Sequence, residues 1–283
     1  MTTDIILSCE FFPPKTETGI SNLIETRKNL AVIKPEYYSV TFGAGGSTQD
    51  NTLEAVIDIQ NASSMTGIAA APHLSCVGSS APRILDLLNQ YRANGIERIV
   101  ALRGDLPSGT RAAGDFRYAN ELIDFIRKET GDHFTIEVAC YPEVHPQANS
   151  AQHDLTNFKR KVDAGANTAI TQYFYNIDAY YYFLDRCQRN GINIPIVPGI
   201  MPINNFSQLA RFSDNCGAEI PRWLRRRLEE FYDDTASLQA FTLDFLTEFT
   251  QKLIESGVPG LHFYTMNKTD PILTVCQRLG LTH

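Results

Sequence analysis

Eight apolar segments with strand character recur along the 283-residue chain, and amphipathic helical segments separate them. The strand segments are residues 5–12, 37–42, 68–76, 98–105, 135–141, 168–174, 194–200 and 261–266. Strands that alternate with helices pair in parallel through right-handed crossovers. Because eight such units close a (β/α)8 barrel, we predict an α/β fold of the TIM-barrel type.

Helical spacing fills the intervals between these strands. The helical segments are residues 20–33, 53–59, 84–91, 118–126 and 180–184. Residues 222–254 leave room for two helices, which predicts an extra helix before the last strand. No low-complexity linker divides the chain, so we expect residues 1–283 to form a single domain. A doubly wound sheet would show the same alternation, but the glycine fingerprint expected after its first strand is absent.

Composition favours small-molecule chemistry. The formal net charge of −7 and the absence of a Lys/Arg block argue against a nucleic-acid partner. The N-terminus lacks the basic and apolar regions of a secretory signal, and no apolar run reaches the length of a membrane span, so we expect a cytoplasmic protein without a membrane partner. The six cysteines form no CxxC pair and no Cys/His ligand spacing, which predicts reduced thiols and no metal site.

One β-loop-α-β unit, residues 134–175, gathers polar side chains at one end of the predicted sheet. The set comprises His145, Asp154, Asn157, Arg160 and Lys161. Two cations beside hydrogen-bonding groups suit a phosphorylated ligand that carries a ribose or ribityl chain. The alternative interpretation is a solvated helix face, which is the commonest arrangement of charges on a helix.

Polar residues also stand where several other predicted strands end, on the face that carries active sites in TIM barrels. Glu10 lies in an apolar run, where loss of water would favour the protonated carboxyl and hence a general acid. The alternative interpretation of Glu10 is that it forms a buried ion pair with Arg103. Asp105 could be a turn former, His73 a satisfied core histidine, and Gln172 a tie between two strands.

Ordered motifs along almost the whole chain resemble the methylenetetrahydrofolate reductase family, in the form of a bacterial single-domain flavoprotein. The motifs are CEFFPPK at 9–15, SVTFGA at 39–44, APHL at 71–74, ALRGD at 101–105, YPEVHP at 141–146, KRKVDAGA at 159–166, ITQ at 170–172, PGIMP at 198–202 and HFYTMN at 262–267. Their number and order make this resemblance far more specific than any one short pattern.

The resemblance implies a flavin-dependent barrel that binds FAD. In this family NAD(P)H reduces FAD, and the reduced flavin passes a hydride to 5,10-methylenetetrahydrofolate in a ping-pong reaction. The product, 5-methyltetrahydrofolate, supplies methyl groups for methionine synthesis. Glu10 matches the general acid that opens the folate ring, and Asp105 matches the catalytic acidic position near the flavin and pterin. Gln172 matches a residue that contacts folate and, in its turn, nicotinamide.

The resemblance also assigns cofactor and substrate positions. The residues that match FAD contacts are Thr41, Phe42, Ala44, His73, Arg103, Gly104, Asp105, Ala119, Tyr141, His145, Asp154, Asn157, Arg160 and Lys161. Gln208 and Phe212 match substrate positions. Lys268 stands where some bacterial members carry arginine, so its contact with the folate tail would be a single point charge. Bacterial members favour NADH over NADPH as the co-substrate, and the family predicts a homo-oligomer.

Two other functions fit parts of the pattern. A different flavin-dependent barrel, such as a proline-dehydrogenase-like oxidoreductase, would also need the phosphate-binding helix. A non-catalytic subunit that binds folate or flavin would keep the binding residues without turnover. Reoxidation of the flavin by folate would exclude both.

Overall fold

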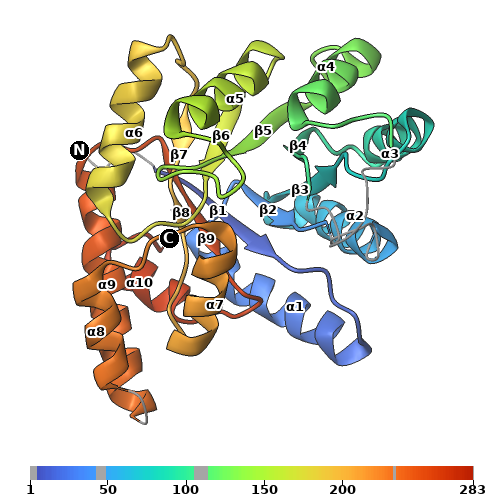
Figure 1. Ribbon diagram of the computed structural model, residues 1–283. Coiled ribbons are helices and arrows are strands. Elements are labelled where there is room, and N and C mark those ends of the chain that lie inside the picture. Colours follow the sequence, from blue (N-terminus) through green and yellow to red (C-terminus); the bar gives the residue numbers. More distant parts are fainter. Residues whose placement is uncertain (1–4, 43–48, 105–113, 232–233, 283) are drawn as a thin grey trace.

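The computed structural model describes residues 5–42, 49–104, 114–231 and 234–282, with the side chain of Gln49 left out of the description. Parallel strands form the centre of the molecule, and helices lie outside them (Figure 1). The strands are β1 (Ile6–Phe11), β2 (Tyr37–Val40), β3 (Ala69–Ser75), β4 (Arg98–Leu102), β5 (Thr135–Cys140), β6 (Thr168–Thr171), β7 (Ile196–Val197), β8 (Gly199–Ile200) and β9 (Gly260–Tyr264). The predicted α/β barrel is therefore confirmed.

The ring of strands closes at Pro198. β7 precedes this proline and pairs with β6, whereas β8 follows it and pairs with β9. β9 in turn pairs with β1, with Glu10 in register with Tyr264. Because proline has no N–H to give to the ladder, the segment predicted as one strand over residues 194–200 is two short strands that share one position in the barrel.

Helices follow the strands in alternation, as predicted. They are α1 (Glu17–Leu30), α2 (Gln49–Thr66), α3 (Ala81–Ala93), α4 (Ala119–Thr130), α5 (Ala151–Asp163), α6 (Ile177–Arg189), α7 (Phe206–Cys216), α8 (Arg222–Glu230), α9 (Thr235–Glu255) and α10 (Ile272–Arg278), with a 3-10 turn, η1 (Ala31–Ile33), after α1. Side-chain oxygens of Ser80, Ser150 and Asn205 accept hydrogen bonds from backbone N–H groups in the first turns of α3, α5 and α7. These caps satisfy donors that the helix itself leaves without partners, and so they fix where each helix begins.

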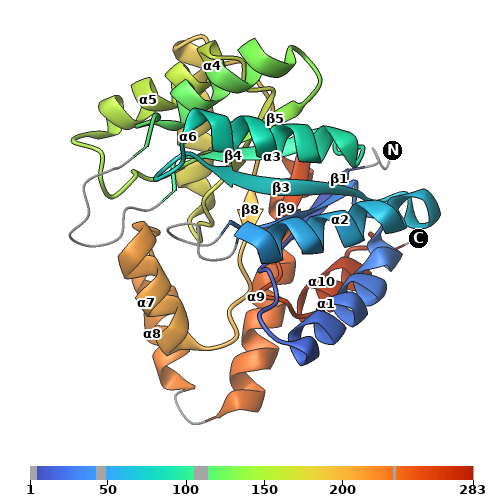
Figure 2. The same ribbon diagram turned by 90° about the vertical axis from the view of Figure 1, so that its right-hand side faces the viewer.

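The two helices predicted within residues 222–254 are α8 and α9, which confirms the insertion before the last strand. With α7 they extend the molecule to one side of the barrel (Figure 2). Their apolar faces enclose a small separate core that includes Leu209, Leu224 and Leu228. Tyr173 and Tyr175 join this core, although the sequence pattern placed Tyr173 in a strand. β6 in fact ends at Thr171, because the aromatic run beyond it turns to pack beneath α7 and α8.

The main core lies between the outer face of the barrel and the surrounding helices. The barrel interior is different, because polar side chains cross it. Tyr37 on β2 donates a hydrogen bond to Glu137 on β5, and two further strands separate these two in the sheet. The bond must therefore run through the barrel instead of along its wall. Within the described residues no helix is long and apolar enough to cross a membrane.

Candidate functional site

Glu10 lies at the centre of the carboxyl end of the barrel, near the end of β1. Its side chain is 14% exposed, and its Oε2 lies 3.2 Å from Nε2 of His73 on β3. Nε2 of His262 on β9 lies 3.5 Å from the same oxygen. Both histidine nitrogens are buried, and neither makes a hydrogen bond of good geometry. Three strands thus bring three titratable groups to one point.

The electrostatics correct the prediction that burial keeps Glu10 protonated. Burial does raise its pKa, but the nearby imidazoles of His73 and His262 outweigh that effect and lower the pKa to about 2. Glu10 is therefore a carboxylate at neutral pH in the free protein. The alternative of an ion pair with Arg103 is wrong as well, because Arg103 donates to the carbonyl of Gly104 and to the side chain of Gln147.

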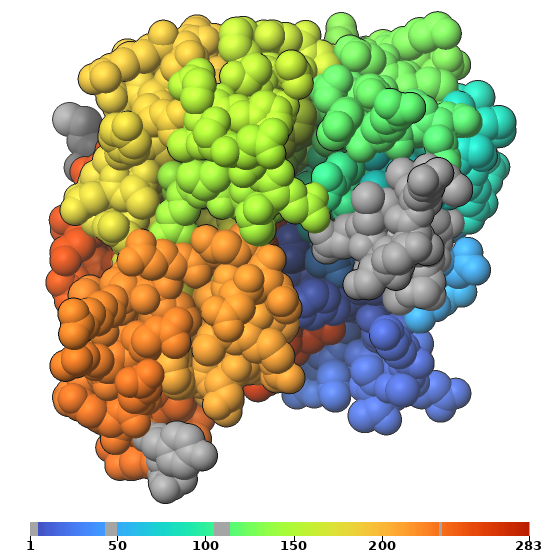
Figure 3. All heavy atoms as spheres, in the orientation of Figure 1, coloured from blue at the N-terminus to red at the C-terminus, as the bar shows by residue number. Residues whose placement is uncertain are grey.

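A cavity of about 410 Å³ opens beside the barrel, between α4, α5 and the loop after β5. It is lined by eight of the residues predicted to bind FAD: Arg103, Ala119, Tyr141, His145, Asp154, Asn157, Arg160 and Lys161. The structure thus brings these eight residues together around one cavity. The yellow-green segment that carries α5 borders a hollow in the space-filling view (Figure 3).

The donors and acceptors in this cavity are held in place by contacts with one another. Asp154 accepts a hydrogen bond from the backbone N–H of His145 at 2.9 Å, and Asn157 accepts one from Arg160 at 2.9 Å. Lys161 donates to the carbonyl of Ala139, and burial lowers the pKa of its ammonium group. A half-buried cation in this position is stabilised by an anion that replaces water, so the donor set fits a phosphate-bearing ligand.

The strand ends connect this cavity to Glu10. Gly104 follows Arg103 with φ of +84°, and a Cβ built there would lie 1.9 Å from Oγ of Ser75. Only glycine permits this close approach of the backbone to β3. Ser75 lies two residues beyond His73, on the same side of β3, and His73 contacts Glu10. Oγ of Ser75 also donates to the carbonyl of Arg103 at 2.9 Å, so the ends of β4 and β3 link a residue of the cavity wall to the strand that carries His73.

Two further predicted FAD residues lie just past the end of β2. The N–H of Thr41 donates to the carbonyl of Phe11 at 2.9 Å, which continues the pairing of β1 with β2, and Phe42 follows it. Both are half-buried and neither lines the cavity. Ala44 and Asp105 lie outside the described residues, so their predicted roles stay predictions.

Three predicted substrate residues, Gln208, Phe212 and Lys268, line a smaller pocket of about 90 Å³. It lies between α7 and the loop that follows β9, and Met201 and Met266 complete its apolar wall. The spacing of these three residues in the sequence gives no sign that they lie together, and only the family resemblance grouped them.

Gln172 lies apart from that pocket. Its side-chain oxygen accepts a hydrogen bond from the N–H of Tyr173, and it lines a narrow crevice with Glu143. Burial raises the pKa of Glu143 to about 6, although a hydrogen bond from the N–H of Glu219 opposes the shift. Glu143 is thus a second carboxyl that could hold a proton on this face.

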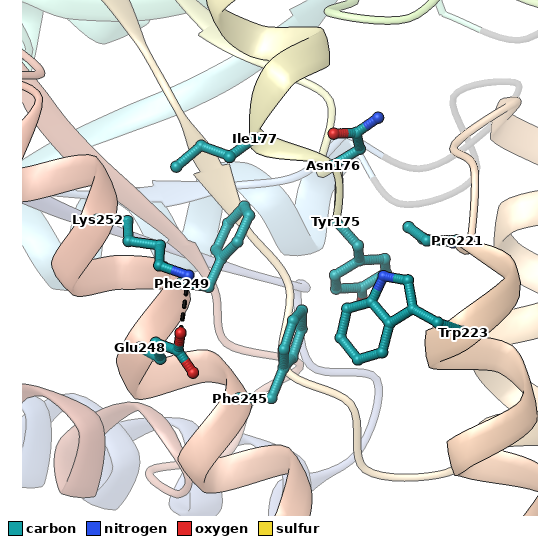
Figure 4. A pocket seen from close by; sticks show the side chains of 9 residues that line it. All are labelled: Tyr175, Asn176, Ile177, Pro221, Trp223, Phe245, Glu248, Phe249 and Lys252. Carbon is teal, nitrogen blue, oxygen red and sulfur yellow. Dashed lines mark hydrogen bonds and ion pairs between the residues drawn. The ribbon is translucent and has the colours of Figure 1, made fainter.

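A further cavity of about 440 Å³ contains none of the predicted site residues (Figure 4). Trp223, Phe245 and Tyr175 converge on it, with ring centroids 5.7 Å apart for Trp223 and Phe245. The cation on its wall, Lys252, is paired with Glu248 at 2.7 Å. The polar residues that the sequence predicted to act together lie elsewhere.

His262 received no role in the sequence analysis, although it lies against Glu10. The signal available was a histidine within the apolar strand sequence GLHFY, where a polar side chain is costly unless it has a partner. That partner could not be named from the sequence, because Glu10 lies at the opposite end of the chain.

Comparisons with known proteins agree with this geometry. The sequence model of the methylenetetrahydrofolate reductase family matches residues 1–280. The 5,10-methylenetetrahydrofolate reductase of Escherichia coli K12 is 40% identical over 277 residues, which cover 98% of this chain and 91% of that protein. Methylenetetrahydrofolate reductase (NADH) 1 of Arabidopsis thaliana is 40% identical over 287 residues, covering 97% of this chain and 48% of the plant protein.

Solved structures support the fold. A Clostridium thermocellum protein described as binding two copies of 5-methyl-5,6,7,8-tetrahydrofolic acid aligns with a TM-score of 0.62 at 16% identity, over 97% of this chain and 93% of that one. The dihydropteroate synthase of Xanthomonas albilineans aligns with a TM-score of 0.52 at 12% identity, over 98% of this chain and 92% of that one. At these identities the likeness extends to the fold alone. The match of the family model to residues 1–280, together with 40% identity to curated members, shows that the chain belongs to the methylenetetrahydrofolate reductase family of oxidoreductases.

Proposed function

We propose that this protein reduces 5,10-methylenetetrahydrofolate to 5-methyltetrahydrofolate, with FAD as bound cofactor and NADH or NADPH as the source of electrons. The observation that carries the proposal is the position of Glu10 against His73 and His262, at the same end of the barrel as the cavity beside α5. The printed name of the Arabidopsis relative favours NADH. Cytoplasmic location, assembly into a homo-oligomer and a link to methionine synthesis stay predictions from the sequence.

The cavity residues would hold the phosphates and hydroxyls of FAD. Arg160 and Lys161 carry the positive charge that a pyrophosphate needs, and Asp154 and Asn157 offer acceptors for hydroxyl groups. When bound, FAD supplies a group that accepts a hydride from NADH and gives a hydride to the folate. We propose that Thr41, Phe42, Ala44, His73, Gly104 and Asp105 line the rest of this site.

The role of Glu10 in this proposal is to give a proton to a folate ring nitrogen. The proton converts that nitrogen into a leaving group, so the five-membered ring opens to an iminium carbon that accepts a hydride. Gln208, Phe212 and Lys268 would hold the substrates in turn, since they share one pocket near Glu10's end of the barrel. One site that takes its two substrates alternately gives ping-pong kinetics.

The test of the proposed function follows the flavin absorbance of the purified protein without oxygen. We expect NADH to bleach the flavin and methylenetetrahydrofolate to restore its colour, with 5-methyltetrahydrofolate as the product. Bleaching without recovery by folate would contradict the proposed acceptor. A protein that takes up no FAD would contradict the whole proposal.

A charge substitution on α5 tests the proposed FAD site. Lys161→Gln is expected to weaken FAD binding by about 10-fold to 100-fold, because it removes a charged hydrogen bond to the phosphates. Titration of the apoprotein with FAD, followed by flavin fluorescence, measures the effect. Lys159→Gln is the matched control, since Lys159 lies on the same helix but pairs with Asp163 at 2.6 Å. Equal weakening by both variants would contradict the assignment.

A further inference from the structure

A row of buried polar side chains crosses the barrel behind Glu10. Nδ1 of His262 lies 2.8 Å from Oγ of Ser8, and the ring of Tyr37 lies beside the imidazole, with ring centroids 6.4 Å apart. Tyr37 donates to one oxygen of Glu137, and Arg98 donates to the other. We call His262, Ser8, Tyr37, Glu137 and Arg98 the interior chain.

The interior chain ends at water on the opposite face of the barrel. Arg98, the first residue of β4, also pairs with Glu36, whose side chain is 43% exposed. Glu137 itself is 3% exposed and His262 is fully buried. The chain thus runs from the amino ends of the strands to the carboxyl ends, where Glu10 lies.

The composition of this interior calls for an explanation. Branched aliphatic side chains usually fill the inside of a TIM barrel. Polar side chains there lose their contacts with water, and they recover that free energy only through their contacts with one another. A purely structural core would need none of them, and the end of the row at Glu10 connects it to the proposed reaction.

The proposed reaction needs a proton whose source has not yet been identified. Reduction of a methylene group to a methyl group takes up one hydride and one proton, and NADH provides the hydride alone. Glu10 is a carboxylate in the free protein, so it must receive a proton before it can give one. Among the described residues, the titratable groups paired with its Oε2 are the two histidine nitrogens at 3.2 Å and 3.5 Å.

We propose that His262 supplies the proton that Glu10 passes to the substrate, and that Ser8, Tyr37 and Glu137 hold its ring in position for this transfer. The inference rests on the proposed function. The N–H bond at Nε2 of His262 breaks and an O–H bond forms at Oε2 of Glu10. That O–H bond then breaks as the proton moves to the folate nitrogen, whose bond to the methylene carbon opens. His262 returns to its protonated form by taking one proton from water in each turnover.

The geometry favours His262 over His73 for this role. The Ser8 hydroxyl engages Nδ1 of His262, which leaves Nε2 directed at Glu10. None of the interior-chain residues lines the pocket of Gln208, Phe212 and Lys268 or the cavity beside α5, so they act on the reaction through Glu10.

Titration of His262 depends on the groups that face it from the surrounding strands. Glu10 and Ser8 face it from β1, and Tyr37 from β2, with ring centroids 6.4 Å apart. His73 on β3 shares the same oxygen of Glu10, and Tyr264 on β9 has its ring 5.2 Å away.

Two substitutions test the inference through the two half-reactions. In the wild type, we expect the rate of flavin reoxidation by methylenetetrahydrofolate to fall as pH rises, because His262 loses its proton. His262→Gln is expected to lower this rate by about 10-fold or more and to remove the pH dependence, since a general acid without its proton loses most of its effect. Flavin reduction by NADH should stay unchanged. His133→Gln is the matched control, because that histidine contacts the carbonyl of Ile96 away from Glu10.

Tyr37→Phe provides a milder test that keeps the ring packed against Arg98. Loss of the hydroxyl removes the hydrogen bond to Glu137 that fixes the Tyr37 ring beside His262, so the rate of flavin reoxidation by methylenetetrahydrofolate should fall. Tyr180→Phe is its control, because the Tyr180 hydroxyl also makes a buried hydrogen bond, at 2.8 Å to the carbonyl of Ile196 outside the barrel interior. A wild-type pH profile in His262→Gln together with a wild-type rate in Tyr37→Phe would overturn the inference.

Nuclear magnetic resonance separates this inference from the proposed function. The ring nitrogens of His262, labelled with ¹⁵N, report its protonation without any substrate. We expect the ¹⁵N chemical shifts of His262 to change in Tyr37→Phe, because the two rings are neighbours, and to stay in place in Tyr180→Phe. If the wild type failed to reduce folate, the proposed function would fail while this titration still measured the interior chain. Identical ¹⁵N chemical shifts in both variants would overturn the interior chain alone.

Discussion

Replacement of Glu10 by glutamine is expected to slow the reduction of methylenetetrahydrofolate by about 100-fold to 10,000-fold, the usual contribution of a general acid. Glutamine fills the same space between His73 and His262, so the barrel should keep its shape. Flavin reduction by NADH needs no proton from Glu10 and should keep its rate. Stopped-flow absorbance of the flavin measures the two half-reactions separately.

Glu143→Gln is the informative comparison for this prediction. Burial raises the pKa of Glu143 to about 6, so among the described residues it is a carboxyl on this face that can carry a proton near neutral pH. We expect this variant to reduce folate at close to the wild-type rate. If Glu143→Gln failed to reduce folate while Glu10→Gln still did so, Glu143 and not Glu10 would be the general acid.

The same Glu10 variant has a defined effect on stability. The pKa of Glu10 is about 2 in the folded protein and near 4.5 when exposed, so its ionised form stabilises the fold above pH 4.5. That contribution is lost as pH falls from 4.5 towards 2. The free energy of unfolding of Glu10→Gln should therefore depend less steeply on pH in this window than that of the wild type.

Arg98→Ala is expected to lower the free energy of unfolding by about 3–5 kcal/mol, because it leaves the buried carboxylate of Glu137 without its ion-pair partner. Urea unfolding followed by circular dichroism measures the change. Arg278→Ala removes a comparable ion pair with Asp244, but there the two side chains are 43% and 73% exposed. Its expected cost is below about 1 kcal/mol.

A double variant shows where the cost of Arg98→Ala arises. Arg98→Ala with Glu137→Leu removes both charges of the buried pair, so part of the lost stability should return. A cost for Arg98→Ala no larger than that for Arg278→Ala would mean that water reaches Glu137. No recovery in the double variant would mean that packing of Arg98 against Tyr37 carries the effect.

The barrel itself could be predicted from the sequence, because each strand and helix has a local period that survives in the structure. The errors arose where distant contacts decide the outcome. β6 ends at Thr171, although the apolar run continues, because the aromatic residues that follow pack beneath α7 and α8. The interruption of the strand at Pro198 is a local signal that a stricter reading of proline would have found.

The residues of the site also fall into two groups: those that the local sequence predicted and those whose surroundings depend on distant parts of the chain. The polar face of α5 was visible in the spacing of Asp154, Asn157 and Lys161, and the structure places all three on one cavity. The protonation of Glu10 was predicted wrongly, because its local surroundings are apolar while the histidines that lower its pKa come from β3 and β9. Gln208, Phe212 and Lys268 carry no chemical signal of their own, and only the family resemblance predicted them.

The pairing of β1 with β9 has a consequence for how the chain folds. Ser8 and His262 are 254 positions apart, yet they touch because the first and last strands are neighbours. Contacts over such a separation form slowly, since a long loop must close before they bring any stabilisation. Strands β1 to β6 can assemble in the order of synthesis. The contact of Glu10 with His262 forms only after β9 has paired with β1. The surroundings of the Glu10 carboxylate are thus among the last parts of this molecule to fold.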